Sequence, residues 1–132
     1  MKPNQIVYRV VRLHNFKGAG SIVTLTAEEG AGEHRLRIIS PAESLQVINH
    51  HSLDGFEFGC ARAGAAQLAL AMLLDFTESK STAAHLYQAF KMDHVLRWAG
   101  ASASIDGETI GRWIDQMQRA AAHAELRQGG RL

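Results

Sequence analysis

The chain has 132 residues, of which 46% are hydrophobic and 20% charged. It is therefore long enough for one domain with a hydrophobic core and too apolar for a disordered protein. Fourteen basic residues stand against thirteen acidic ones, a formal net charge of +1, which excludes a strong overall field for gathering nucleic acid. Cys60 is the single cysteine, so an internal disulfide and a cysteine-based zinc site are both excluded.

The first part of the chain predicts an antiparallel meander of three strands over about residues 5–39. Residues 6–13 and 21–26 are rich in β-branched side chains, and residues 34–39 alternate between polar and apolar. Both patterns are typical of strands. Short glycine-containing segments separate the three runs, and such connections join antiparallel neighbours.

The third predicted strand carries basic residues on one face. Because side chains alternate along a strand, Arg35 and Arg37 should lie opposite Leu36 and Ile38. We expect Arg9 of the first strand to join the two arginines on the solvent face of the sheet. Such a basic face could meet nucleic acid or an acidic protein surface. An ordinary solvated sheet face is the alternative.

The rest of the chain predicts helices over residues 41–47, 64–76, 82–98 and 107–126. Residues 64–76 are apolar on nearly every side, so we expect a helix that is buried all round. Its leucines should form the centre of the core: Leu68, Leu70, Leu73 and Leu74. The sequence thus predicts a single α+β domain over residues 1–132, a small antiparallel sheet covered by three to four helices.

Two helix starts carry local signals. Ser40-Pro41-Ala42-Glu43 has the form of a capping box with proline at the first helical position. Asp106 is typical of a residue that caps the last helix, and residues 100–104 before it are small and predict a flexible connection.

The segment before the buried helix holds the titratable cluster with the most evident chemistry. His50, His51, Asp54 and Glu57 lie within eight residues and could bind a divalent metal, with His51 as a general base. This spacing matches no established metal motif, and polar side chains that order a turn are the alternative. We therefore predict no catalytic residue, metal or cofactor, and keep a metal-assisted hydrolase as the second hypothesis.

Residues 59–64 precede the same helix and contain two glycines. They could form an anion-binding helix N-terminus with charge added by Arg62. The segment lacks the pattern of a nucleotide-binding loop. An ordinary loop, in which glycine lets two backbones approach closely, is the alternative.

From His51 onward the chain contains three groups of motif residues. They comprise His51, Ser52, Gly55, Phe56, Glu57, Gly59, Gly64, Ala66, Gln67, Leu68, Ala69 and Leu70, then Tyr87, Gln88, Phe90 and Lys91, and finally Ile110 and Trp113. In these the chain resembles an uncharacterised family of small proteins from phages, plasmids and other bacterial mobile elements, with a pattern like HSPxGFEWGYGGSGPAQLALALL. Where that pattern has proline, tryptophan and tyrosine, this chain has Leu53, Phe58 and Cys60, and its glycine-rich loop becomes residues 61–65, which weakens a phosphate-cradling role. The resemblance implies no activity.

We expect a small non-enzymatic binding protein of a mobile element that contacts a host macromolecular complex. Inhibition of a host defence complex, CRISPR or restriction, is the sharper version and follows from the resemblance alone. The predicted partner-binding residues are Arg35, Arg37, His51, Glu57 and Arg62.

The expected location is the cytoplasm, without a membrane partner. The first residues lack a signal-peptide layout, and the apolar run that ends at Leu74 is too short to cross a bilayer. A homodimer stays open, because an exposed edge of the sheet could pair with its copy.

Overall fold

The computed structural model describes residues 5–14, 21–30, 35–48 and 55–129. The elements in chain order are β1 (Ile6–His14), β2 (Ser21–Glu29), β3 (Arg35–Ile39), α1 (Ala42–Val47), α2 (Ala63–Thr77), α3 (Lys80–Asp93), the 3₁₀ turn η1 (Val95–Arg97), β4 (Ser102–Asp106) and α4 (Gly107–Gly129). This is the predicted α+β fold, with a three-strand meander followed by helices.

The strands form one antiparallel sheet in the order β3-β2-β1-β4. β4 was not predicted, because its serine and alanine residues have weak strand propensity and indicated a flexible connection. It pairs with β1 from Val7↔Asp106 to Val11↔Ser102. Without β4, the outer backbone groups of β1 would lack these partners, and this tertiary requirement outweighs propensity.

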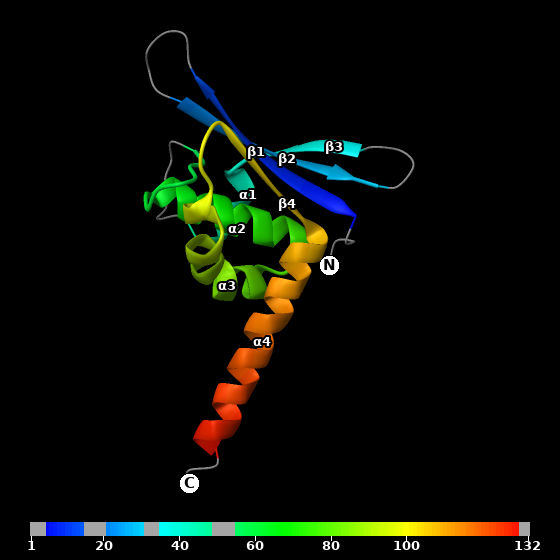
Figure 1. The fold of residues 1–132 in the computed structure, drawn as a ribbon, viewed down its shortest axis with the longest axis vertical. Coiled ribbons are helices and arrows are strands. Elements are labelled where there is room, and N and C mark those ends of the chain that lie inside the picture. Colours follow the sequence, from blue (N-terminus) through cyan, green and yellow to red (C-terminus); the bar gives the residue numbers. More distant parts are fainter. Residues whose placement is uncertain (1–4, 15–20, 31–34, 49–54, 130–132) are drawn as a thin grey trace.

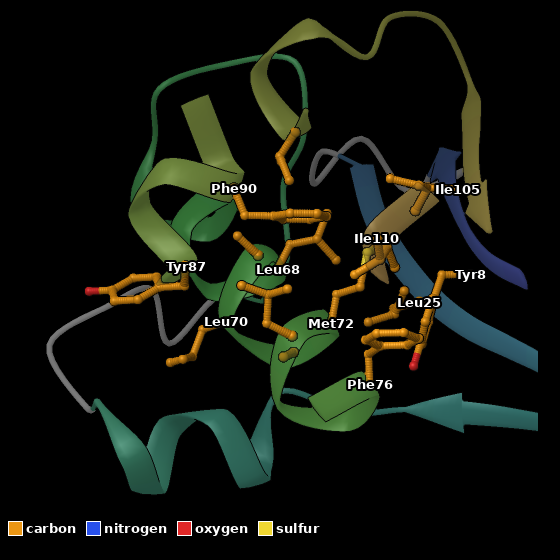
Figure 2. Close-up of a cluster of buried hydrophobic side chains, with 14 of the residues drawn as sticks. Tyr8, Leu25, Leu68, Leu70, Met72, Phe76, Tyr87, Phe90, Ile105 and Ile110 are labelled. Carbon is orange, nitrogen blue, oxygen red and sulfur yellow. The ribbon is translucent and has the colours of Figure 1, made fainter. Parts of the chain in front are cut away.

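The helices lie on one side of the sheet, and α4 extends away from the rest of the molecule toward the C-terminus (Figure 1). α2 is the centre of the core: Leu68, Leu70 and Leu73 are fully buried. Leu74 is only half-buried, which corrects its predicted place at the core centre. Figure 2 shows Tyr8 of β1, Leu25 of β2 and Phe76 of α2 packed together, and the Tyr8 and Phe76 rings meet edge to face at 6.5 Å.

The helix predicted over residues 82–98 ends early. α3 begins at Lys80 behind Ser79, whose hydroxyl accepts the Thr82 N–H, and it stops at Asp93. His94 leaves helical geometry, with φ −126° and ψ −61°. A 3₁₀ turn follows and places Val95 in the core. The break is tertiary in origin, because the Val95 carbonyl accepts the N–H of Gly59.

The two predicted helix caps have different outcomes. Asp106 Oδ1 accepts the Thr109 N–H at 2.7 Å, which confirms the cap and lowers the pKa of Asp106. The capping box at Ser40 is wrong, because α1 has no side-chain cap. Instead the Ser44 hydroxyl donates to the Pro41 carbonyl at 2.8 Å.

Among the described helices, none is long and apolar enough to cross a membrane.

Candidate interaction surface

The register of the sheet decides which side chains of β3 share a face with β1. Arg37 is opposite Ala27 and Ala27 is opposite Tyr8, whereas Ile38 is opposite Thr26 and Thr26 is opposite Arg9. Directly opposite residues in a ladder point to the same side of the sheet. Arg37 therefore lies on the helix-covered side with Tyr8, and Arg9 lies on the other side with Ile38. The predicted basic face of Arg9, Arg35 and Arg37 is wrong.

Arg37 is held in a polar cluster at the end of α2. Its guanidinium donates to Asp75 at 2.7 and 3.0 Å and to Glu29 at 2.8 Å. The Tyr8 hydroxyl donates to the same Asp75 carboxylate at 2.6 Å. Burial, followed by the bond to Asp75, raises the pKa of Tyr8, and the bond to Asp75 raises the pKa of Arg37. Arg37 thus joins β3 to β2 and α2.

The loop before α2 is held by close backbone contacts. Phe56 forms a bridge with Val23 of β2, and the Gly59 N–H donates to the Val95 carbonyl at 2.9 Å. A Cβ on Gly59, which has φ +74°, would stand 2.5 Å from the Trp98 carbonyl oxygen. A Cβ on Gly64 would stand 2.7 Å from the Gly55 carbonyl oxygen. These glycines let the loop lie between the sheet, α2 and η1, as the loop interpretation of the sequence requires.

The predicted partner-binding residues that the structure describes do not form one surface. Arg35 and Arg62 are exposed, whereas Glu57 is half-buried and its Cγ faces Gly64. Arg62 directly precedes α2, and Arg37 binds Asp75 in the last turn of α2, about 20 Å away along the helix at 1.5 Å per residue. His51 lies outside the described residues. Arg62 and Arg37 are therefore at opposite ends of α2.

The predicted metal loop is only partly described. His50, His51 and Asp54 lie outside the described residues, and Glu57 is the one member whose position is known. Within the described ranges, no group of three or more His, Cys, Asp or Glu side chains could hold a metal ion. The hydrolase hypothesis therefore gains no support from the described geometry.

Sequence reasoning missed the role of Arg12. Its guanidinium donates to the carbonyls of Gly100 and Phe58 at 2.7 and 2.8 Å and lies 4.1 Å from the centroid of the Phe58 ring. Arg12 therefore ties β1 to the loop before α2 and to the segment before β4. No local pattern distinguishes this arginine from a solvated one.

His94 is packed between aromatic rings at the junction of α3 and α4. The centroid of its ring lies 4.9 Å from that of Phe90 and 5.9 Å from that of Trp113. Trp113 donates to Asp93 at 2.8 Å. His94 Nε2 is buried without a hydrogen-bond partner, and burial lowers the pKa of His94. The geometry favours a structural role for a neutral imidazole.

Two cavities adjoin the charged clusters. The larger, about 520 Å³, is lined by Glu43, Gln46, Leu74, Asp75, Glu78 and Lys80. A second, about 350 Å³, includes His94, Trp98 and Asp106 in its lining. Asp75 and Asp106 are already engaged, by Arg37 with Tyr8 and by the start of α4. The lining of the second cavity also includes the Ser104 and Thr109 hydroxyls, but His94 Nε2 makes no hydrogen bond with either of them.

The side of the sheet away from the helices carries large apolar side chains. Within the described residues, six large hydrophobic side chains are exposed: Leu13, Ile22, Leu36, Ile38, Met92 and Leu126. The first four lie on this side by the sheet register. We name it the open face: Val7, Arg9, Val11, Leu13, Ile22, Thr24, Thr26, Glu28, Leu36 and Ile38, with Ser102, Ser104 and Asp106 of β4.

The open face is most exposed at β3, one of the two edge strands. Ile38 is 80% exposed and Leu36 68% exposed. Leu13 and Ile22 are opposite each other in the β1–β2 ladder. The sequence did place Leu36 and Ile38 on the same face. The sequence could not show that this face is the uncovered one, because the ion pair between Arg37 and Asp75 forms only in the folded protein.

A comparison with known families matches residues 19–116, from β2 to the first half of α4, to a family of unknown function, DUF6166. The chain belongs to this family. The DUF6166 match covers Ile22, Leu36 and Ile38 of the open face and the whole of α2 and α3. No match to a curated protein or to a solved structure was found. Membership in DUF6166 thus carries no activity.

Proposed function

We propose that the protein is a non-enzymatic binding protein that contacts another protein through the open face. One observation carries the proposal: of the large hydrophobic side chains exposed in the described residues, two thirds gather on one face of the sheet. Single exposed apolar residues are common on proteins, but a group of them on one face is typical of an interaction site.

The energy available to such an interface is substantial. Fully burying a leucine or isoleucine side chain is worth about 1.5–3 kcal/mol. Four of these side chains on the open face are 52–80% exposed: Leu13, Ile22, Leu36 and Ile38. A partner that covers all four therefore gains a few times that free energy. Threonines and Val11 between them offer further contact area.

The charge of the open face favours a protein over a nucleic acid. Arg9 is its one basic side chain, whereas Glu28 and Asp106 are acidic. Phosphate binding requires several basic groups on one surface, and the arginines that could have supplied them, Arg35 and Arg37, lie on the other side. A protein surface that offers both apolar and charged groups fits this face.

The proposed partner is a component of a host cell. The resemblance to small proteins of mobile elements supports a host macromolecular complex in the cytoplasm as the target. Inhibition of a CRISPR or restriction complex is the sharpest version, and it has that resemblance as its support.

The test compares capture by matched variants. Tagged wild-type protein, Ile38→Glu and Leu126→Glu are incubated with bacterial lysate, and bound proteins are quantified by mass spectrometry. Leu126 is 76% exposed but lies on α4, so it controls for the loss of an exposed apolar group. We expect a partner that Leu126→Glu retains and Ile38→Glu loses.

The three arginines predicted to bind the partner need a separate test. Arg37→Glu would place a second carboxylate against Asp75 and damage the fold, so it does not test a binding role. Arg35→Glu combined with Arg62→Glu does, because both side chains are exposed. If this double variant loses the partner and Ile38→Glu keeps it, the open face is not the binding surface.

A further inference from the structure

β3 is an edge strand, and its outer side has no partner strand in the described part of the chain (Figure 1). We propose that the binding partner adds an extended segment to this edge as a further strand, held by the backbone groups of Leu36 and Ile38. The inference rests on the proposed function, because it takes these two residues as part of the binding surface. It adds how the partner is held and which side chains its segment carries.

The hydrogen bonds of β1 show in which direction its backbone groups point. The Arg12 N–H donates to the Ala101 carbonyl, on the β4 side, at 2.7 Å. The Arg9 carbonyl accepts the Thr26 hydroxyl, on the β2 side, at 3.4 Å. Along an antiparallel strand, successive residues direct their N–H and C=O groups alternately to the two sides. Even-numbered residues of β1 therefore bond toward β4, and odd-numbered residues bond toward β2.

The same alternation fixes the direction of the backbone groups in β2 and β3. Odd-numbered residues of β1 pair with even-numbered residues of β2, so the odd-numbered residues of β2 bond toward β3. Their partners in β3 are Arg35, Arg37 and Ile39. The N–H and C=O groups of Leu36 and Ile38 therefore point away from β2, at the outer edge of the sheet.

The two residues with outward backbone groups also carry the most exposed apolar side chains of the described sheet, Ile38 at 80% and Leu36 at 68%. An added strand would bind both pairs of N–H and C=O groups and place its own side chains beside these two. The other edge strand, β4, has outward groups at Ser102, Ser104 and Asp106 by the same alternation. None of those side chains is apolar, so β3 is the edge that gains more from a partner strand.

The charge beside β3 indicates which side chains the added segment carries. Residues of the segment opposite Arg35 and Arg37 would lie on the helix-covered side of the sheet. Arg37 is already neutralised in its polar cluster, whereas Arg35 is exposed and forms no ion pair with a described residue. An acidic side chain beside Arg35 complements its charge. The segment therefore alternates apolar residues, beside Leu36 and Ile38, with acidic ones.

The same charges disfavour a second copy of β3 as the added strand. A two-fold register centred on Arg37 places Arg37 opposite its own copy, and a register centred on Leu36 places Arg35 opposite Arg37 of the copy. Like charges directly opposite each other destabilise a strand pair. A register centred on Ile38 avoids this repulsion but pairs Leu36 with Ser40, which lies beyond the end of β3. A different chain with acidic residues meets no such conflict.

A peptide titration followed by amide NMR tests the edge. The probe is a short peptide of alternating valine and glutamate with blocked ends, and its control has lysine in place of glutamate. We expect the glutamate peptide to shift the amide signals of Leu36 and Ile38 and to slow their hydrogen exchange by roughly tenfold or more. Arg35→Glu should reverse the preference between the peptides. If neither amide responds at millimolar peptide, or if both peptides bind equally well, the inference is overturned.

Matched variants separate backbone pairing from side-chain contact. Proline is accepted on an edge strand where its nitrogen faces solvent, so Leu36→Pro removes an outward donor without breaking a bond to β2. Leu36→Pro should abolish the peptide response, whereas Leu36→Ala keeps the N–H and should only weaken it. Ser104→Pro makes the same change on β4 and should have no effect. Equal responses of Leu36→Pro and Leu36→Ala overturn the strand pairing.

The fold of each variant is checked by thermal melts followed by circular dichroism. If Leu36→Pro is unfolded, the amide exchange of Leu36 and Ile38 in the wild type decides alone. Failure of this inference differs from failure of the proposed function. A captured partner that Ile38→Glu loses and Leu36→Pro retains keeps the proposed function and overturns the strand pairing. A peptide response at β3 without any such partner keeps the edge site and removes the proposed function.

Discussion

Arg37 of β3 and Asp75 of α2 form a two-pronged ion pair, with nitrogen–oxygen distances of 2.7 and 3.0 Å. The pair joins the edge of the sheet to the central helix, and Tyr8 donates to the same carboxylate. It fixes which side of β3 faces the helices. Leu36 and Ile38 are consequently on the open face.

Removing the Asp75 carboxylate should weaken the fold. Asp75→Asn replaces the charged acceptor of three hydrogen bonds, and we expect a loss of about 1–2 kcal/mol after allowance for solvent screening of the partly exposed Arg37. Chemical denaturation measures it. The control is Asp115→Asn, whose bridge to Arg119 is exposed and should contribute close to nothing. Equal effects of the two variants would contradict a structural role for Asp75.

Alanine at Gly59 should be more harmful than alanine at Gly100. Both glycines have positive φ, +74° and +82°, so each substitution costs about 1–2 kcal/mol of backbone strain. At Gly59 the new Cβ also meets the Trp98 carbonyl oxygen, whereas at Gly100 no atom lies within 4 Å. We expect Gly59→Ala to lose a further ~1–3 kcal/mol in denaturant titrations. Similar losses at both sites would show that the loop moves freely away from Trp98.

Acidification should destabilise the protein through His94. Burial lowers the pKa of His94 in the folded state, Arg97 also lowers it, and Asp93 opposes the shift. A lowered pKa means that the unfolded chain takes up a proton first. The contribution of His94 is therefore complete above the unfolded pKa of about 6.5 and is lost as the pH falls from there toward the folded pKa.

The measurement is the free energy of unfolding against pH for the wild type and for His94→Phe. The variant keeps an aromatic ring beside Phe90 and Trp113 but has no titrating group. We expect its profile to be flatter below pH 6.5. Parallel profiles would show that His94 is not the source of the acid sensitivity.

The buried amide of Gln67 should behave as one unit with Ser44. Gln67 Nε2 donates to the Ser44 hydroxyl at 2.5 Å, and Gln67 Oε1 is buried without a partner. Ser44→Ala alone leaves a second polar atom unpaired and should lose about 1–3 kcal/mol. The double variant with Gln67→Met should recover most of this loss, because an apolar side chain of similar length needs no partner. A strictly additive double-mutant cycle would contradict the coupling.

The sequence determined the features that depend on local patterns. The unbroken apolar run predicts α2 as a helix buried on all sides, and the structure places Leu68, Leu70 and Leu73 at full burial. Asp106 was predicted as the residue that caps the last helix, and it accepts the Thr109 N–H. These predictions succeed because periodicity and capping involve residues within one or two helical turns.

Only the tertiary structure decided the features that depend on distant partners. β4 forms because the second edge of β1 needs hydrogen-bond partners. α3 stops at Asp93 because the carbonyl of nearby Val95 accepts a hydrogen bond from the Gly59 N–H. Alternation along β3 defines two faces but not which one is covered. Asp75, 38 residues further along the chain, makes that choice by holding Arg37, and it thereby leaves Leu36 and Ile38 to form the open face.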